Sequence, residues 1–268
     1  MKQTVKRITP EPLWDAARST YDALARLPEL PAAAWHPWRR ASRKRLAALR
    51  DIHKGERCFI IGNGPSLRST DLHRLRNEFT FGLNRIYLLF PELGFTTTYF
   101  LSMNDLVIEQ CAAEIQALPI PKFLTWRSHR FIDFTEDTHF LYTTYTGPKF
   151  ARDVTGRLWE GATVTYVALQ LAYHMGFEKV ILIGVDHNFV TKGDANKTIT
   201  SQGDDPNHFA PNYFGKGFKW QLPDLETSER AYRMAKSAYA AAGRAVLDAT
   251  VAGKLTVFPK VDYNDLFK

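Results

Sequence analysis

Short apolar runs that alternate with helix-like segments constrain the fold of this chain more than any other feature. The most apolar run, 179–186, has consecutive hydrophobic positions, which are typical of a strand buried on both faces of a sheet. Further strands are expected at 57–62, 79–84, 97–102, 122–125, 138–142 and 255–258. Helices are expected at about 105–117, 164–175 and 225–247. The alternation predicts an α/β fold with a doubly wound, mostly parallel, Rossmann-like sheet covered by helices on both faces.

The first 54 residues differ from the rest in charge and pattern. Residues 1–57 hold 13 Lys and Arg against 6 Asp and Glu, while the remaining chain holds 22 of each, so the whole net charge of +7 lies in this part. Apolar residues three and four apart over 11–27 predict an amphipathic helix, and three prolines separate it from a second helix at about 39–53. We therefore expect a basic helical extension, 1–54, before a Rossmann-like domain, 55–268.

This charge distribution bears on the partners of the chain. A nucleic-acid-binding protein usually carries its excess charge on the recognition domain, and here that domain is neutral, so no nucleic acid partner is expected. The basic residues between Trp35 and Arg50 can lie on anionic lipid headgroups, or they can form an ordinary solvated helix face. Residues 35–50 are therefore an expected site of peripheral membrane contact.

Apolar content and cysteines indicate the compartment. No apolar run approaches the roughly 20 residues that span a bilayer, and the N-terminus lacks an apolar signal core. Cys58 and Cys111 are the two cysteines, too few for a disulfide framework, which fits a reducing environment. We expect a cytoplasmic protein, either fully soluble or peripheral on the inner face of the membrane.

A glycine turn follows the first predicted strand. Gly62-Asn63-Gly64-Pro65-Ser66 lies between a strand and a helix start, where free backbone N–H groups favour a phosphate. Leu67 occupies the place of the third glycine in the dinucleotide pattern, and the next strand ends in Asn84 where an acidic residue would hold the ribose. A nicotinamide cofactor is therefore not expected. The alternative is that these residues form a turn for structural reasons alone and bind no ligand.

Polar residues follow three of the predicted strands. Asn63, Asn84 and Asn104 would all project from the carboxyl edge of a parallel sheet, which is where such sheets bind ligands. Amide groups both donate and accept, and so suit a ribose and a base better than a metal. Asp105 and Asp186 also lie at strand ends and are an alternative pair of magnesium ligands.

Residues 190–224 are predicted to be a lid. Gly, Asp, Asn, Pro and Lys dominate this long irregular segment, and five aromatic residues interrupt it, which favours a lid over a disordered insert. His208 within it is a candidate general base, although a surface loop histidine is the simpler reading. His187 is a secondary candidate, whereas His174 lies in an apolar helix and is expected to be a packing residue. Lys216 and Lys219 can reach a phosphate if the lid closes.

The run 60–67, followed by Asp71-Leu72 and Asn84-Arg85-Ile86-Tyr87, resembles the start of bacterial sialyltransferases of glycosyltransferase family 42. It equally resembles the wider MptE-like superfamily, which includes archaeal 6-hydroxymethylpterin diphosphokinases and the flagellin-glycosylating Maf proteins. The likeness extends over about 57–260, and beyond the glycine turn its matches are weaker.

The resemblance implies a GT-A-like variant of the Rossmann fold, with a nucleotide-binding catalytic domain at 55–268. It implies inverting transfer of a sialic acid-like or other ulosonic acid sugar from a CMP-activated donor to a glycan or glycolipid, without a metal or other cofactor and with His208 as general base. The donor carboxylate would lie near Thr163. Those sialyltransferases carry two tyrosines where this chain has His187 and Asn188, so Tyr213, Lys216 or Lys219 would have to assist the departing phosphate. The expected donor-binding residues are Gly62, Asn63, Gly64, Pro65, Ser66, Asn84, Asn104, Thr163, Asp186, Tyr213 and Lys216.

Two other functions are open on the sequence. The first is a diphosphokinase-like transfer from ATP to a pterin or similar alcohol, with magnesium on Asp105 and Asp186. The second is a non-catalytic nucleotide-binding module that keeps the fold and lacks the chemistry.

Overall fold

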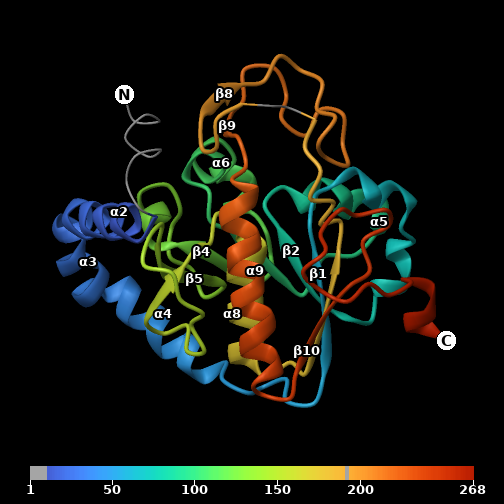
Figure 1. The fold of residues 1–268 in the computed structure, drawn as a ribbon, viewed down its shortest axis with the longest axis horizontal. Coiled ribbons are helices and arrows are strands. Elements are labelled where there is room, and N and C mark those ends of the chain that lie inside the picture. The colour runs from blue at the N-terminus through green and yellow to red at the C-terminus, as the bar shows by residue number, and fades with distance from the viewer. Residues whose placement is uncertain (1–10, 191–192) are drawn as a thin grey trace.

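Eight parallel strands form one sheet in the structure, which is a computed structural model that describes residues 11–190 and 193–268. Every pairing is parallel, and the strand order is β10-β7-β1-β2-β3-β4-β5-β6 (Figure 1). The predicted parallel sheet is confirmed. The strands are β1 Arg57–Ile61, β2 Phe79–Leu83, β3 Tyr99–Ser102, β4 Lys122–Thr125, β5 Thr138–Thr144, β6 Arg157–Trp159, β7 Lys179–Ile183 and β10 Ala245–Asp248.

Helices cover both faces of this sheet, as a doubly wound fold requires. Cys58 and Ile60 of β1 belong to the core beneath α8 (Val164–Met175) and α9 (Leu225–Ala240), which cross one face in Figure 1. Phe59 and Ile61 belong to the opposite core, with α6 (Asp105–Gln110) and α7 (Ala112–Gln116). Four short 3-10 helices and α5 (Phe90–Leu93) complete the connections on the early strands: η2 Pro65–Ser69, η3 Leu72–Leu75, η4 Ile86–Leu89 and η5 Trp126–Arg130.

The C-terminal part differs from the sequence-based prediction. The expected helix at 225–247 ends at Ala240, because Gly243 takes a left-handed φ of +70° and the chain then enters β10. Residues 255–258, predicted to be the last strand, have no regular structure, and a short 3-10 helix, η6 Asn264–Phe267, follows. The edge strand of the sheet on this side is therefore β10.

The N-terminal helices are α2 (Glu11–Arg26), η1 (Leu27–Glu29), α3 (Leu30–Trp35) and α4 (Pro37–Ala48). A proline occupies the first turn of η1, α3 and α4, where its missing N–H is harmless. Although α4 lies inside the expected extension, it packs against β5, and Ser42 accepts a hydrogen bond from the Phe140 N–H. Residues 1–10 of that extension lie outside the described residues. No helix in the described part of the chain is long and apolar enough to cross a bilayer.

The expected lid contains a two-stranded antiparallel ribbon, β8 (Thr198–Thr200) with β9 (Lys219–Gln221), at the top of Figure 1. Its aromatic residues pack on one another: the Phe214 and Trp220 rings stack at 5.3 Å. The Phe209 N–H donates to the Asn63 carbonyl, and Arg68 donates to the Phe209 carbonyl at 2.6 Å. The lid is thus docked on the carboxyl edge of the sheet. Residues 191 and 192 of the expected lid are outside the described part.

Candidate functional site

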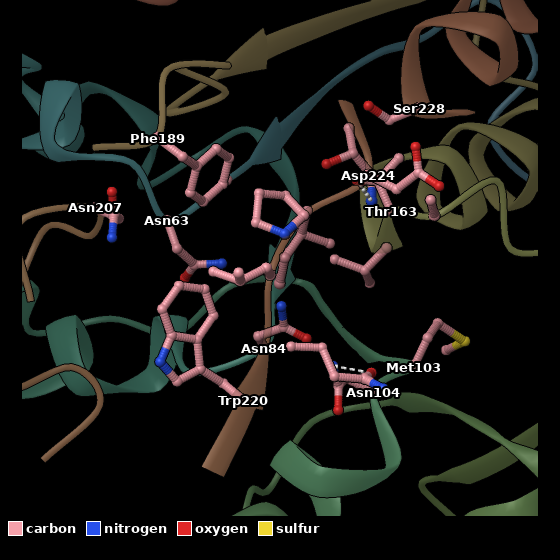
Figure 2. A pocket seen from close by; sticks show the side chains of 18 of the residues that line it. Asn63, Asn84, Met103, Asn104, Thr163, Phe189, Asn207, Trp220, Asp224 and Ser228 are labelled. Atoms are coloured by element: carbon pink, nitrogen blue, oxygen red, sulfur yellow. Dashed lines mark hydrogen bonds between the residues drawn. The ribbon is translucent and has the colours of Figure 1, made fainter. Parts of the chain in front are cut away.

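A cavity of about 530 Å³ lies at the carboxyl edge of the sheet, beneath the lid. The turns after β1, β2, β3 and β7 line it, together with the first turns of α8 and α9 and residues of the lid (Figure 2). Strands β2 to β6 follow one another on one side of β1, and β7 lies on its other side. The cavity is therefore at the topological switch point between β1 and β7, which is where open α/β sheets bind ligands.

The three strand-end asparagines all line this cavity, as their positions predict, but they serve different purposes. Asn104 caps α6, because its Oδ1 accepts from the Leu106 and Val107 N–H groups. Asn84 has a left-handed φ of +49°, and its Oδ1 accepts from Ser102 at 3.1 Å. The Oδ1 of Asn63 is buried and has no hydrogen-bond partner within the described residues. Asn63 is therefore the amide best placed to receive a donor group from a ligand.

The glycine turn is held by the end of β7, which accepts from the N–H groups of both of its glycines. Gly62 and Gly64 donate to the carbonyls of Ile183 and Gly184. The N–H and hydroxyl of Ser66 donate to the two carboxylate oxygens of Asp186, at 3.0 and 2.6 Å. A Cβ at Gly64 would lie 1.8 Å from Asp186 Oδ2.

These contacts do not favour the phosphate that the sequence predicts at this turn. The N–H groups of Gly62, Gly64 and Ser66 are already bonded, and a carboxylate beside them would repel an anion. Pro65 has no N–H and begins η2, and it does not line the cavity. The glycines are needed because the end of β7 approaches the turn closely. Asp186 links the ends of β1 and β7.

The N-terminus of α8 offers the cavity a positive electrostatic end. Thr163 is the N-cap residue, and its hydroxyl accepts from the Thr165 N–H. Thr163, Val164 and Thr165 all line the cavity, and the 12-residue helix runs away from it. The first N–H groups of a helix and its dipole favour a carboxylate or phosphate. The anion site that the sequence predicts at the glycine turn is better matched by this helix end.

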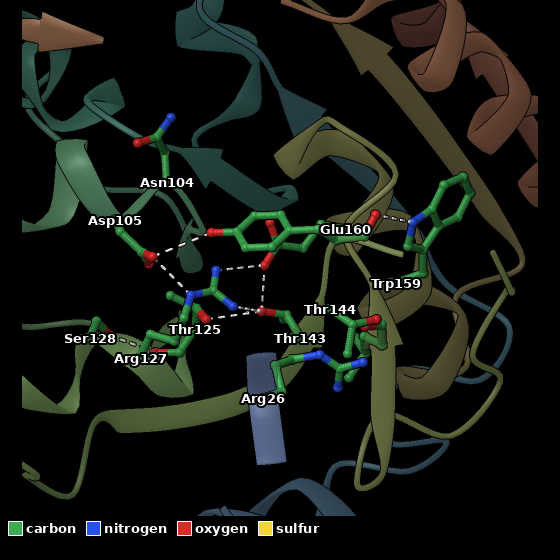
Figure 3. A network of polar contacts seen from close by, with 12 residues as sticks. Arg26, Asn104, Asp105, Thr125, Arg127, Ser128, Thr143, Thr144, Trp159 and Glu160 are labelled. Carbon is green, nitrogen blue, oxygen red and sulfur yellow. Dashed lines mark hydrogen bonds and ion pairs between the residues drawn. The ribbon is translucent and has the colours of Figure 1, made fainter. Parts of the chain in front are cut away.

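Carboxylates are abundant in the cavity wall, and no Lys or Arg among the described residues lines it. Two of these carboxylates are bound by Arg127, which lies behind the wall (Figure 3). Its guanidinium contacts Asp105 Oδ2 and Glu160 Oε1, both at 2.8 Å, and Thr143 donates to the same oxygen of Glu160. Burial opposes the charge of Arg127, but Glu160 and Asp105 raise its pKa above the ordinary value. Burial and the Glu160 charge raise the pKa of Tyr145, which donates to Asp105.

His208 lies in the lid and lines the cavity. Its Nδ1 is 2.8 Å from Asp205 Oδ2, and its ring stacks on Tyr213 with centroids 4.1 Å apart and planes 6° apart. Because a carboxylate only accepts, Nδ1 carries a proton and Nε2 is left as the basic nitrogen of the neutral ring. Asp205 is a residue that sequence reasoning missed. Its spacing of three residues from His208 is the one signal that could have found it.

Comparison with known families adds to this geometry. The model of the family described as "6-hydroxymethylpterin diphosphokinase MptE-like" matches residues 40–192, more than half of the chain. The chain belongs to the MptE-like family. A search of curated proteins finds no match. A solved structure of the MAf glycosyltransferase from Magnetospirillum magneticum AMB-1 superposes with a TM-score of 0.49 and 15% identity, over 84% of this chain and 38% of that chain. The MptE-like chain thus spans about two fifths of the length of that protein.

The magnesium ligands of the diphosphokinase alternative can be tested on this MptE-like chain. Asp105 follows β3 and Asp186 follows β7, with two strands between them, so their backbones are roughly 14 Å apart at the usual strand spacing. Their carboxylates are bonded to Arg127 and Ser66. In the described ranges, no three His, Cys, Asp or Glu residues are grouped so that they could hold a metal ion. The pair does not fit one shared magnesium site.

Several other predicted residues lie away from the cavity. Tyr213 is buried beneath His208, its hydroxyl accepts from the Arg85 N–H, and burial raises its pKa. Lys216 is exposed and does not line the cavity, and Lys219 is exposed on the ribbon beside Gln110. These positions correct the expectation that Tyr213, Lys216 or Lys219 reaches the departing phosphate. His187 does line the cavity, where its Nε2 contacts Glu229 at 3.1 Å.

Proposed function

We propose that this MptE-like protein is a glycosyltransferase that moves an acidic, ulosonic acid-type sugar from a CMP-activated donor to a hydroxyl of a glycan or glycolipid. The observation that carries the proposal is the Asp205–His208 pair in the wall of the cavity. A carboxylate that holds one ring nitrogen keeps the other one basic and stabilises the imidazolium formed when it takes a proton.

Three features of the otherwise acidic cavity support an anionic sugar nucleotide as the donor. The buried amide oxygen of Asn63, which has no partner among the described residues, can accept from a donor group of the base or ribose. The N-terminus of α8, with the hydroxyl of Thr163, favours the carboxylate or phosphate of the donor. Arg127 pairs with both Asp105 and Glu160 and offsets one of their two negative charges, which reduces their repulsion of that anion.

The reaction that follows is a single displacement with inversion. The acceptor hydroxyl gives its proton to Nε2 of His208 as its oxygen bonds to the anomeric carbon. The bond between that carbon and the phosphate oxygen breaks, and CMP leaves with the electron pair. Because the described cavity residues include no Lys or Arg, the α8 N-terminus is the feature that stabilises the departing phosphate.

Nucleotide binding tests the donor class. We expect calorimetry to give CMP binding that is unchanged by a chelator, and weaker binding by UDP and ATP. Replacement of Asn63 by Ala should weaken CMP binding by about 1–3 kcal/mol if its amide holds the nucleotide. Binding of ATP that requires magnesium, with no CMP binding, would refute the donor assignment and favour the diphosphokinase.

Loss of the base tests the chemistry. The variant His208→Ala should lower kcat by roughly 100-fold or more and leave CMP affinity within about twofold. His73→Ala, an exposed histidine in η3, is the matched control. Equal kcat in the His208 variant and the control would remove His208 from the mechanism. A protein that binds CMP and never turns over any acidic CMP-sugar would instead be a binding module.

A further inference from the structure

Helix α2 is amphipathic, but its polar side, and not its apolar side, packs against the protein. Asp22 is 8% exposed and pairs with Arg26 at 2.6 Å, and Arg26 also donates to the Tyr142 hydroxyl at 3.1 Å. Leu24 is two residues from Asp22, about 200° around the helix axis, and its side chain is 60% exposed. The polar pair thus docks the helix, and the described residues leave the leucine side uncovered.

Large apolar side chains continue along this outer surface onto η1 and α3. Six of them are more than two fifths exposed, whereas most apolar residues of the domain are buried. We call this set the outer apolar face, and it consists of Leu13, Tyr21, Leu24, Leu27, Leu30 and Trp35. Six such side chains on consecutive helices are far more than the scattered exposed apolar residues of an ordinary surface.

Exposed cations follow the outer apolar face directly. Arg40, Arg43 and Lys44 are exposed on α4, within nine residues of Trp35. The other polar groups of α4 face inward: Arg39 is buried and donates to the Thr155 carbonyl, and Arg45 donates to carbonyls of the loop before β5. The cations left at the surface therefore follow the apolar face along the chain, within α4.

We propose that α2, η1 and α3 lie on an anionic lipid surface. The leucines enter the boundary of the acyl chains, Trp35 lies at the interface, and Arg40, Arg43 and Lys44 contact the headgroups. Charge complementarity favours lipid over a second copy of the chain, because two-fold pairing of this face would bring its own cations together.

This assignment refines the contact predicted for residues 35–50. Trp38, one of the two tryptophans in that segment, stacks on Phe134 and Phe140 and is not free to meet a membrane. The apolar part of the contact lies earlier, at 13–35, and only the exposed cations of α4 contribute from the later segment.

Co-sedimentation of the full chain with vesicles tests the proposal. We expect binding to phosphatidylcholine vesicles that contain phosphatidylglycerol and little binding to phosphatidylcholine alone. Leu24→Ser with Leu27→Ser should lower the partition coefficient on the order of tenfold for each leucine. The matched control is Val251→Ser, an exposed apolar residue in the loop after β10.

Charge reversal tests the headgroup contact separately. Arg40→Glu should lower the partition coefficient by about fivefold or more, since each cation near an anionic surface contributes about 1 kcal/mol. Lys254→Glu, exposed in the loop after β10, should have a smaller effect. Unaltered thermal unfolding of each variant excludes misfolding as the cause.

Any of three results would overturn the proposal. The first is the absence of binding to anionic vesicles by the native chain. The second is binding by the leucine variant that equals that of the Val251 control. The third is a native dimer in sedimentation analysis that the leucine variant converts to a monomer, which would assign the outer apolar face to a second copy.

Discussion

Replacement of Arg127 by Met tests how the acidic wall of the cavity is stabilised. The side chains of Arg127 and Glu160 are 10% and 11% exposed, and that of Asp105 is 32% exposed. Removal of the cation leaves the Glu160 carboxylate buried, with the Thr143 hydroxyl as its hydrogen-bond donor. Breaking a buried pair in this way costs about 3–5 kcal/mol, and the partial exposure of Asp105 places the expected loss near 3 kcal/mol.

Urea unfolding measures this loss, and two further variants calibrate it. Arg50 pairs with Asp153 at 2.7 Å, but both side chains are about half exposed, so Arg50→Met should cost less than about 1 kcal/mol. Glu160→Gln in the Arg127→Met background removes the unpaired charge and keeps an oxygen for Thr143, so we expect it to restore roughly half of the loss.

Two results would refute this reasoning. If Arg127→Met lowers the free energy of unfolding no more than Arg50→Met does, the ion pairs of Arg127 contribute no more than an exposed ion pair. If Glu160→Gln gives no recovery, the cost comes from lost packing of the arginine stem and not from an unpaired carboxylate.

Three shorter predictions concern other parts of the chain. Asp205→Asn should lower kcat by roughly 100-fold with little change in CMP affinity. The amide that replaces the carboxylate can also donate to Nδ1 of His208, which favours the tautomer whose Nε2 carries the proton and is not basic. A pH–rate profile equal to that of the native protein would contradict this. Gly64→Ala should cost about 1–3 kcal/mol in urea unfolding by collision with Asp186 alone, since a φ of −70° suits any residue. Burial lowers the pKa of His139 in the folded chain to about 4. As the pH falls from about 6.5, this histidine therefore takes up a proton in the unfolded chain before it does so in the folded chain. The free energy of unfolding declines by up to about 3 kcal/mol as a result. His139→Phe should flatten that decline, and an unchanged slope between these pH values would show that another group causes it.

The central strands could be predicted because both of their faces are buried. The run 179–186 is apolar at consecutive positions, and β7 indeed has neighbours on both sides and cores above and below it. The edge strand β10 was harder to predict. It follows α9 after four residues, and its apolar residues continue the helical pattern across Gly243. The turn that separates the two elements contains that glycine in the left-handed conformation.

The candidate site could be predicted where it depends on single strand ends. Asn63, Asn84 and Asn104 meet because carboxyl ends of parallel strands share one edge, whatever the details of packing. The Arg127 cluster could not be found in this way. Its carboxylates come from the helix after β3 and from the turn after β6, and no spacing in the sequence indicates that β4 brings the arginine between them.

The family match and the lid divide the cavity into two parts with different physical roles. The MptE-like match ends at residue 192, so it includes the asparagine edge and the α8 N-terminus but not His208. The backbone N–H next to His208, that of Phe209, bonds to the carbonyl of Asn63, whose buried side-chain oxygen has no partner among the described residues. The residue proposed to bind the donor therefore also positions the residue proposed to deprotonate the acceptor. A ligand that orders Asn63 would fix the distance between donor and base, which is the quantity on which a direct displacement depends.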